Sequence, residues 1–213
     1  MIKKISCIKL IPVILFVLRN FLAAQTIELK INAFGGKLYL SSLCGEKTSL
    51  VDSASLSDGK YLFAKRNLPQ GIYRISFADI KWLNFVYDSE DVSISTNANS
   101  VLDSLKIVKS ESNELYYNFL KLNKAYKTKT ELLRFILANF PKDDTYYNET
   151  QKRLNELQNE YVEFVNITSQ TKPDSFTAKY IRSSQLPVID LSVPLDKQLA
   201  YLKSNALNNV NFN

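Results

Sequence analysis

The stretch Lys109–Leu122, KSESNELYYNFLKL, marks the point where the chain changes from one periodicity to another. From Leu115 onward, apolar side chains recur at helical spacing: Leu115, Phe119, Leu122 and Tyr126. A helix is therefore expected here, with Ser112 as its N-cap. Before this stretch, apolar residues alternate with polar ones, which is typical of half-buried strands. The 213-residue chain is predicted to be an α+β protein with strands first and helices second.

Residues 25–108 have the pattern of short strands separated by turns. Alternation is clearest in TIELKINA from Thr26, in KLYLSSL from Lys37 and in IYRISFA from Ile72. Asp58-Gly59 has the sequence of a tight hairpin turn, and Pro69-Gln70-Gly71 that of a second turn. We expect this segment to form an antiparallel β-domain, either a sandwich or a barrel-like fold.

Residues 109–213 are predicted to form an α-helical domain. The first helix, or pair of helices, is expected to run to Phe140 and to end at Pro141 and Asp143-Asp144. The next helix carries an apolar stripe that is expected to pack on a neighbouring helix of the same chain. Its members are Leu154, Leu157, Tyr161, Phe164 and Thr168. Two short helices follow, one capped by Asp174 and running to Ile181, the other over Asp196–Leu207.

The first 24 residues have the pattern of a secretory signal peptide. Lys3 and Lys4 precede the apolar run Leu10–Leu18. Small residues follow, and cleavage is expected after Ala24. A retained membrane anchor is the alternative, but the run is shorter than the roughly 20 residues of a spanning helix. The chain is therefore expected to be exported to the periplasm or cell envelope, with no stable membrane span after cleavage.

The charge and the composition narrow the function classes. The chain has 27 basic and 21 acidic residues, and four of the basic ones belong to the leader. The 23 basic residues that remain exceed the 21 acidic ones by only two, so no nucleic-acid partner, which needs a clustered basic face, is expected. Histidine is absent, which excludes Ser-His-Asp and Cys-His catalysis and imidazole metal sites. No cofactor, metal site or catalytic residue is predicted.

Two sets of residues remain as candidate sites. Cys44 is the only cysteine after the leader, and it is interpreted either as a reactive thiol or as a half-buried residue at a strand end. The pairs Tyr116-Tyr117 and Tyr146-Tyr147 mark either a docking surface or the edge of the core.

Two acidic clusters are candidate cation sites. Asp143-Asp144 lacks the spacing of a calcium loop and is expected to serve the N-terminus of the following helix. The cluster of Asp88, Glu90 and Asp91 is expected to be a solvated turn between strands.

The turn signals, taken together, resemble the N-terminal β-domain of exported thiol-disulfide oxidoreductases of Bacteroidota. The resemblance rests on LVDS from Leu50, SDGKYLF from Ser57 and LPQGIYRI from Leu68. It extends to DVSI from Asp91, to KSESNELYY from Lys109, where that family enters a helical segment, and to the closing residues from Tyr201. In this family a thioredoxin-like domain with a C-x-x-C motif normally follows.

The sequence stops at Asn213 before any such domain, and no catalytic residue of the family maps onto it. The resemblance therefore implies a non-catalytic accessory or binding module, which is either the N-terminal part of such a protein or a stand-alone accessory protein. Its partner is expected to be another protein or the missing thioredoxin-like domain. Two alternatives stay open. One is a redox-active protein that uses Cys44, and the other is a surface protein that self-assembles through the apolar stripe.

Overall fold

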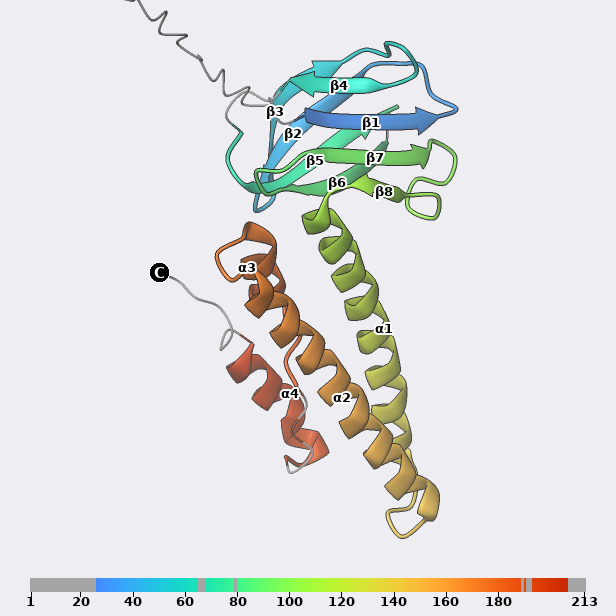
Figure 1. Cartoon of the computed structure of the whole chain (residues 1–213). Helices are drawn as coiled ribbons and strands as arrows, with labels where there is room; N and C mark the ends of the chain where they lie inside the picture. Colours follow the sequence, from blue (N-terminus) through green and yellow to red (C-terminus); the bar gives the residue numbers. More distant parts are fainter. Residues whose placement is uncertain (1–25, 65–67, 79, 189, 191–192, 207–213) are drawn as a thin grey trace, which may run out of the picture.

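A computed structural model describes residues 26–64, 68–78, 80–188, 190 and 193–206. The predicted signal peptide and the predicted helix end at Leu207 lie outside these residues. In the part that is described, eight strands come first and four helices follow (Figure 1). The predicted α+β order, with strands before helices, is therefore confirmed.

The strands form two four-stranded sheets. The first sheet has the order β4 (Tyr61–Ala64), β1 (Thr26–Asn32), β7 (Val92–Asn97) and β8 (Lys106–Lys109). The second has the order β3 (Lys47–Ala54), β2 (Leu38–Cys44), β5 (Gly71–Phe77) and β6 (Lys81–Tyr87). The fold is thus a sandwich rather than a barrel. β8 was not predicted as a strand.

The pairing departs from the sequence-based expectation in two ways. The β1–β7 pair is parallel, whereas every other pairing between the named strands is antiparallel. Asp58 and Gly59 do form a tight turn, with φ angles of 49° and 76°, and Ser57 bridges Lys60 across it. However, the strands on either side, β3 and β4, belong to different sheets. The same is true of β4 and β5 around Pro69-Gln70-Gly71, so both turns move the chain between sheets.

The core lies between the two sheets, where the alternation of each strand places its apolar side chains. Aromatic rings make up much of it, and they come from both sheets: Tyr61, Phe63, Tyr73, Phe77 and Phe85. The two polar rings bond to nearby backbone, as Tyr61 Oη donates to the carbonyl of Phe34 and Tyr73 Oη to that of Pro69. Their hydroxyl groups therefore keep partners although the rings are buried.

The helices extend from one edge of the sandwich (Figure 1). They are α1 (Glu111–Asn139), α2 (Thr145–Thr171), α3 (Phe176–Ser183) and α4 (Leu195–Asn205). α1 is one continuous helix and not a pair. Asp144 caps α2 as expected. The predicted caps Ser112 and Asp174 were wrong, because Ser110 caps α1 and Ser175 caps α3.

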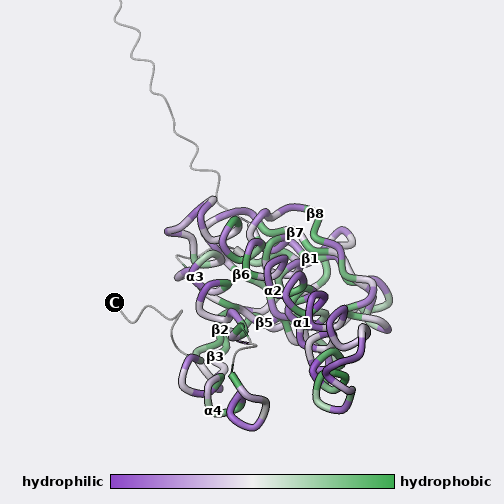
Figure 2. The backbone as a smooth tube through the Cα atoms, turned by 90° about the horizontal axis from the view of Figure 1, so that it is seen from below, coloured by the Kyte–Doolittle hydropathy of each residue, from purple (hydrophilic) through white to green (hydrophobic). Residues whose placement is uncertain are grey.

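We call α1 to α3 (Glu111–Ser183) the helical arm. α1 and α2 run side by side, as Figures 1 and 2 both show. The predicted stripe of α2 faces α1, with Leu154, Leu157 and Tyr161 buried. Val165 is buried in place of the predicted Phe164, which is half-buried. The Tyr161 ring stacks on Tyr126 of α1 with 4.1 Å between centroids. The stripe is therefore occupied by the chain's own helix, as expected.

Candidate partner-binding site

The helical arm is fixed to the sandwich by side chains that bind the outer edge of β6. Asn113 is fully buried, and its side-chain amide bonds to the β6 backbone as a paired strand would. The Val86 N–H donates to Asn113 Oδ1 at 2.8 Å, and Asn113 Nδ2 donates to the Val86 carbonyl at 2.8 Å. One turn later, Tyr117 Oη donates to the carbonyl of Asn84. Backbone groups that an edge strand would leave open are thus satisfied by α1.

The acidic turn after β6 binds the first turns of two helices. Glu90 accepts hydrogen bonds from Ser110 Oγ and from the Ser112 N–H at the start of α1. Asp88 accepts from the Phe176 and Thr177 N–H groups at the start of α3, at 3.1 and 3.0 Å. These N–H groups have no partner within their own helices, and the helix dipole favours anions there. The expectation of a solvated turn was therefore wrong.

Asp91 completes this junction on the side of the sandwich. Its carboxylate accepts from the Thr26 N–H at 2.9 Å and pairs with the ammonium of Lys109, the last residue of β8. The three acids therefore connect the starts of β1, α1 and α3 with the end of β8. In the part of the chain that is described, no cluster of His, Cys, Asp or Glu has the geometry to hold a metal ion.

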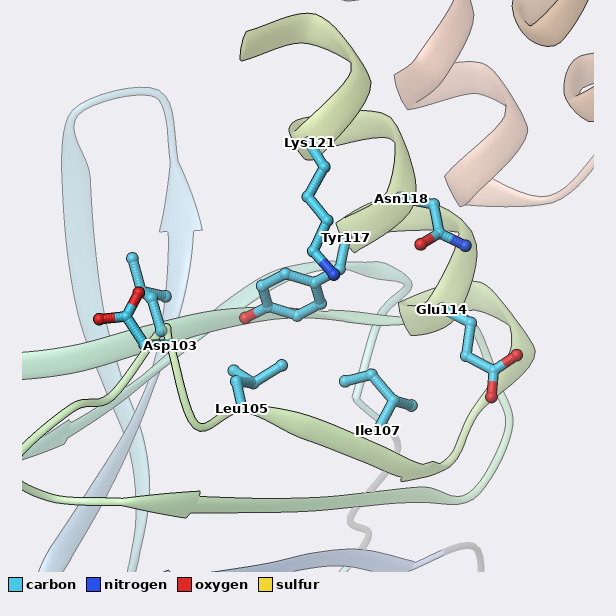
Figure 3. Close-up of a pocket in the computed structure, with 8 residues that line it drawn as sticks. Asp103, Leu105, Ile107, Glu114, Tyr117, Asn118 and Lys121 are labelled. Carbon is cyan, nitrogen blue, oxygen red and sulfur yellow. The ribbon is translucent and has the colours of Figure 1, made fainter. Parts of the chain in front are cut away.

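The neighbouring edge strand, β8, is paired on one side only. It bonds to β7, and the sheet order leaves its other edge without a strand. A pocket of about 550 Å³ lies between this strand and α1 (Figure 3). Its apolar part is formed by Leu102, Leu105 and Ile107. Glu114, Tyr117, Asn118 and Lys121 of α1 line the opposite side, and Asp103 lies at one end.

The pocket combines an apolar base with a polar rim. Lys121 extends toward the Tyr117 ring in Figure 3, and Lys106 is exposed at the start of β8. Among the described residues, neither lysine forms a salt bridge. Burial raises the pKa of Tyr117, and the nearby phenol of Tyr116 raises it further. Tyr117 therefore stays a hydrogen-bond donor to β6 at neutral pH.

The four predicted docking tyrosines are not brought together. Tyr116 is buried in the arm, where its ring lies 5.5 Å from that of Tyr180, and Tyr117 lies between β6 and the pocket. Tyr146 and Tyr147 are at the far end of the arm, at the turn between α1 and α2 (Figure 1). Tyr146 is exposed and packs its ring edge-on against Phe140 at 5.1 Å. Only Tyr117 belongs to the pocket.

Cys44 is exposed, so the expectation of a half-buried residue was wrong. It ends β2 and lies opposite Lys47 across a turn in which Gly45 has a φ of 59°. The pocket is formed by β8, the residues just before it and α1, and the thiol does not line it. The structure therefore offers the thiol to solvent at a hairpin end.

Comparison with known proteins adds no family to this description. No protein-family model matches the chain, and a search of curated proteins finds no match. In the described part of the chain, no helix combines the length and the apolar character that crossing a bilayer requires.

The residues that organise this site were not predicted as site residues from the sequence. Asn113 has no periodic signal, because a buried amide in a helix is recognised only by the strand edge that it contacts. The acids of the turn were noticed, but Asp88 meets Phe176 across 88 positions of sequence. The one available signal was the polar stretch Ser110-Glu111-Ser112-Asn113 at the start of α1, because serine and asparagine side chains favour helix N-termini.

Proposed function

We propose that the chain is a non-catalytic binding module that holds a protein partner in the groove between β8 and α1. The observation that supports this most is the contrast between β6 and β8, the two edge strands that lie next to α1. α1 binds the backbone of β6, while β8 keeps an unpaired edge beside a pocket of about 550 Å³. An extended segment that adds to such an edge gains backbone hydrogen bonds, and a neighbouring pocket selects its side chains.

The proposal extends to the class of partner through the family resemblance. We propose that the partner is a thioredoxin-like domain with a C-x-x-C motif, carried by the same polypeptide or by another exported protein. Because α1 is bonded to β6, it would give such a domain a defined position relative to the sandwich. α1 spans 29 residues, or roughly 43 Å at the rise of an α-helix. The chain would then contribute positioning, and its partner the redox chemistry.

Binding of a thioredoxin-like protein from the same organism tests this proposal by isothermal titration calorimetry. Lys121→Glu reverses a charge at the rim of the groove and is expected to weaken binding several-fold. Lys127→Glu is the matched control, since this exposed lysine lies on the same helix and outside the groove. Absence of saturable binding, or equal loss in both variants, would count against the proposal.

The alternative function as a redox protein rests on the exposure of Cys44. Alkylation of the thiol and a Cys44→Ser variant separate the two functions. The binding proposal expects both treatments to leave partner binding unchanged, because Cys44 lies outside the groove. Loss of a thiol-dependent activity in Cys44→Ser would favour the alternative instead.

A further inference from the structure

The outer face of the second sheet carries two exposed aromatic rings in one row across the strands. Tyr39 of β2 pairs with Ser76 of β5, which pairs with Trp82 of β6. The tyrosine is 44% exposed and the tryptophan 48%, whereas the aromatic side chains of the inner face are buried. Because neighbouring strands lie 4.7–4.9 Å apart, the two aromatic positions are roughly 10 Å apart. The small Ser76 leaves the space between them open.

Each ring is accompanied by a cation. The Arg74 guanidinium lies 4.1 Å from the centre of the Trp82 ring, and its Nε donates to Asn84 Oδ1 at 2.9 Å. The Lys37 ammonium lies 6.0 Å from the centre of the Tyr39 ring. The Arg74 contact holds one face of the indole in place and leaves the rest of the ring exposed.

The face is cationic as well as aromatic. In the described part of the chain, neither Lys37 nor Arg74 takes part in a salt bridge. The strand positions that share the face in these two rows contain no acid: Ser53, Tyr39, Ser76 and Trp82 in one row, and Leu50, Ser41, Arg74 and Asn84 in the next. An anionic ligand would therefore meet no repulsion from these strand positions.

We propose that this face binds an acidic polysaccharide. The C–H face of a sugar ring packs on an aromatic side chain, and its hydroxyl groups stay free for hydrogen bonds at the ring edge. The separation of the two aromatic rings suits two sugar units of one extended chain that have another unit between them. Arg74 and Lys37 supply charge for carboxylate or sulfate groups, and Ser76 and Asn84 supply polar contacts.

A protein partner fits this face less well. Protein interfaces concentrate their aromatic anchors in a contiguous core that excludes water. Here Ser76 separates the two aromatic residues, Ser53 lies beside Tyr39, and Leu50 is the apolar member of the next row. A single-stranded nucleic acid can also stack on such rings, and the experiment below includes it as an outcome.

The chain contains one tryptophan, so its fluorescence reports on this face alone. Polygalacturonate is titrated into the purified chain while Trp82 emission is followed, with neutral dextran and oligothymidylate as comparison probes. The expected result is a saturable change with polygalacturonate that weakens at high salt. Dextran should bind more weakly, since it has no charge to offer Lys37 and Arg74.

Variants that retain the reporter tryptophan locate the contact. Tyr39→Ala should weaken binding about tenfold, the effect of losing one ring contact. Lys37→Glu should weaken it several-fold. Leu62→Ala, an exposed apolar residue on the outer face of the other sheet, is the control and should bind as the unaltered chain does. Circular dichroism checks that each variant is folded.

Four results would overturn the proposal. They are no saturable change with polygalacturonate, equal binding of dextran, tighter binding of oligothymidylate, and unaltered binding by both Tyr39→Ala and Lys37→Glu. The second would assign the face to neutral sugars and the third to single-stranded nucleic acid. None of the four depends on a thioredoxin-like partner.

Discussion

The edge strands β6 and β8 lie on the same side of the sandwich, next to the start of α1, yet their outer edges differ (Figure 1). The backbone of β6 is bonded by Asn113 and Tyr117, whereas β8 faces a pocket and pairs only with β7. Unpaired edges invite further strands, and proteins commonly cover them. One edge therefore fixes the helical arm, while the adjacent edge of β8 carries no further strand.

Removing the β6 contact should have the largest effect on stability. Asn113→Ala leaves the Val86 N–H and carbonyl buried without partners, and we expect a loss of about 3 kcal/mol in the free energy of unfolding. Urea unfolding followed by circular dichroism measures it. Asn118→Ala, an exposed residue five positions later on the pocket side, is the matched control and should change stability by less than about 0.5 kcal/mol. Equal effects of the two substitutions would contradict the comparison.

Alkaline pH should weaken the same contact. Burial raises the pKa of Tyr117 above the value of 10.0 that applies to an exposed tyrosine. Its stabilising contribution is therefore complete below pH 10 and decreases as the pH rises above it, because the unfolded state loses the proton first. We expect a loss of roughly 1–3 kcal/mol at high pH. Tyr117→Phe should reduce the slope of stability against pH, and an unchanged slope would assign the effect to other tyrosines.

The acidic turn offers a smaller test of how the arm is held. Asp88→Ala removes the acceptor for two N–H groups of α3, and we expect a loss of about 1–2 kcal/mol. Asp143→Ala is the control, because the neighbouring Asp144 makes the cap of α2. Thermal unfolding of both variants gives the difference. A loss in Asp143→Ala that equals the loss in Asp88→Ala would show that general charge, rather than the junction, is responsible.

Two stacked tyrosines inside the arm give the smallest test. Tyr161 Oη donates to Asn123 Oδ1 at 2.6 Å and accepts from the Leu186 N–H at 2.9 Å. The buried Tyr126 hydroxyl has no hydrogen-bond partner among the described residues. Tyr161→Phe should therefore cost about 1 kcal/mol, and Tyr126→Phe should be neutral or stabilising. Chemical unfolding distinguishes the two, and a reversed order would contradict these assignments.

Much of the fold follows from local pattern. Alternation located strands such as β1, β2 and β5, and helical spacing located α1 and α2, because the burial of each side chain is set within its own element. The parallel β1–β7 pair and the exchange of strands between sheets were not predictable, since pairing depends on residues distant in sequence. Asn113 was missed for the same reason. Its role depends on its contact with Val86, which lies 27 positions earlier in the chain.

Native-state amide hydrogen exchange, measured residue by residue with NMR, tests the central contrast most directly. The account predicts that the Val86 amide is protected like the core of the sandwich, because it donates to the buried Asn113. The β8 amides that do not bond to β7 should exchange much faster, and they should gain protection on addition of the proposed thioredoxin-like partner. Rapid exchange of Val86 at the rate of those β8 amides would contradict it.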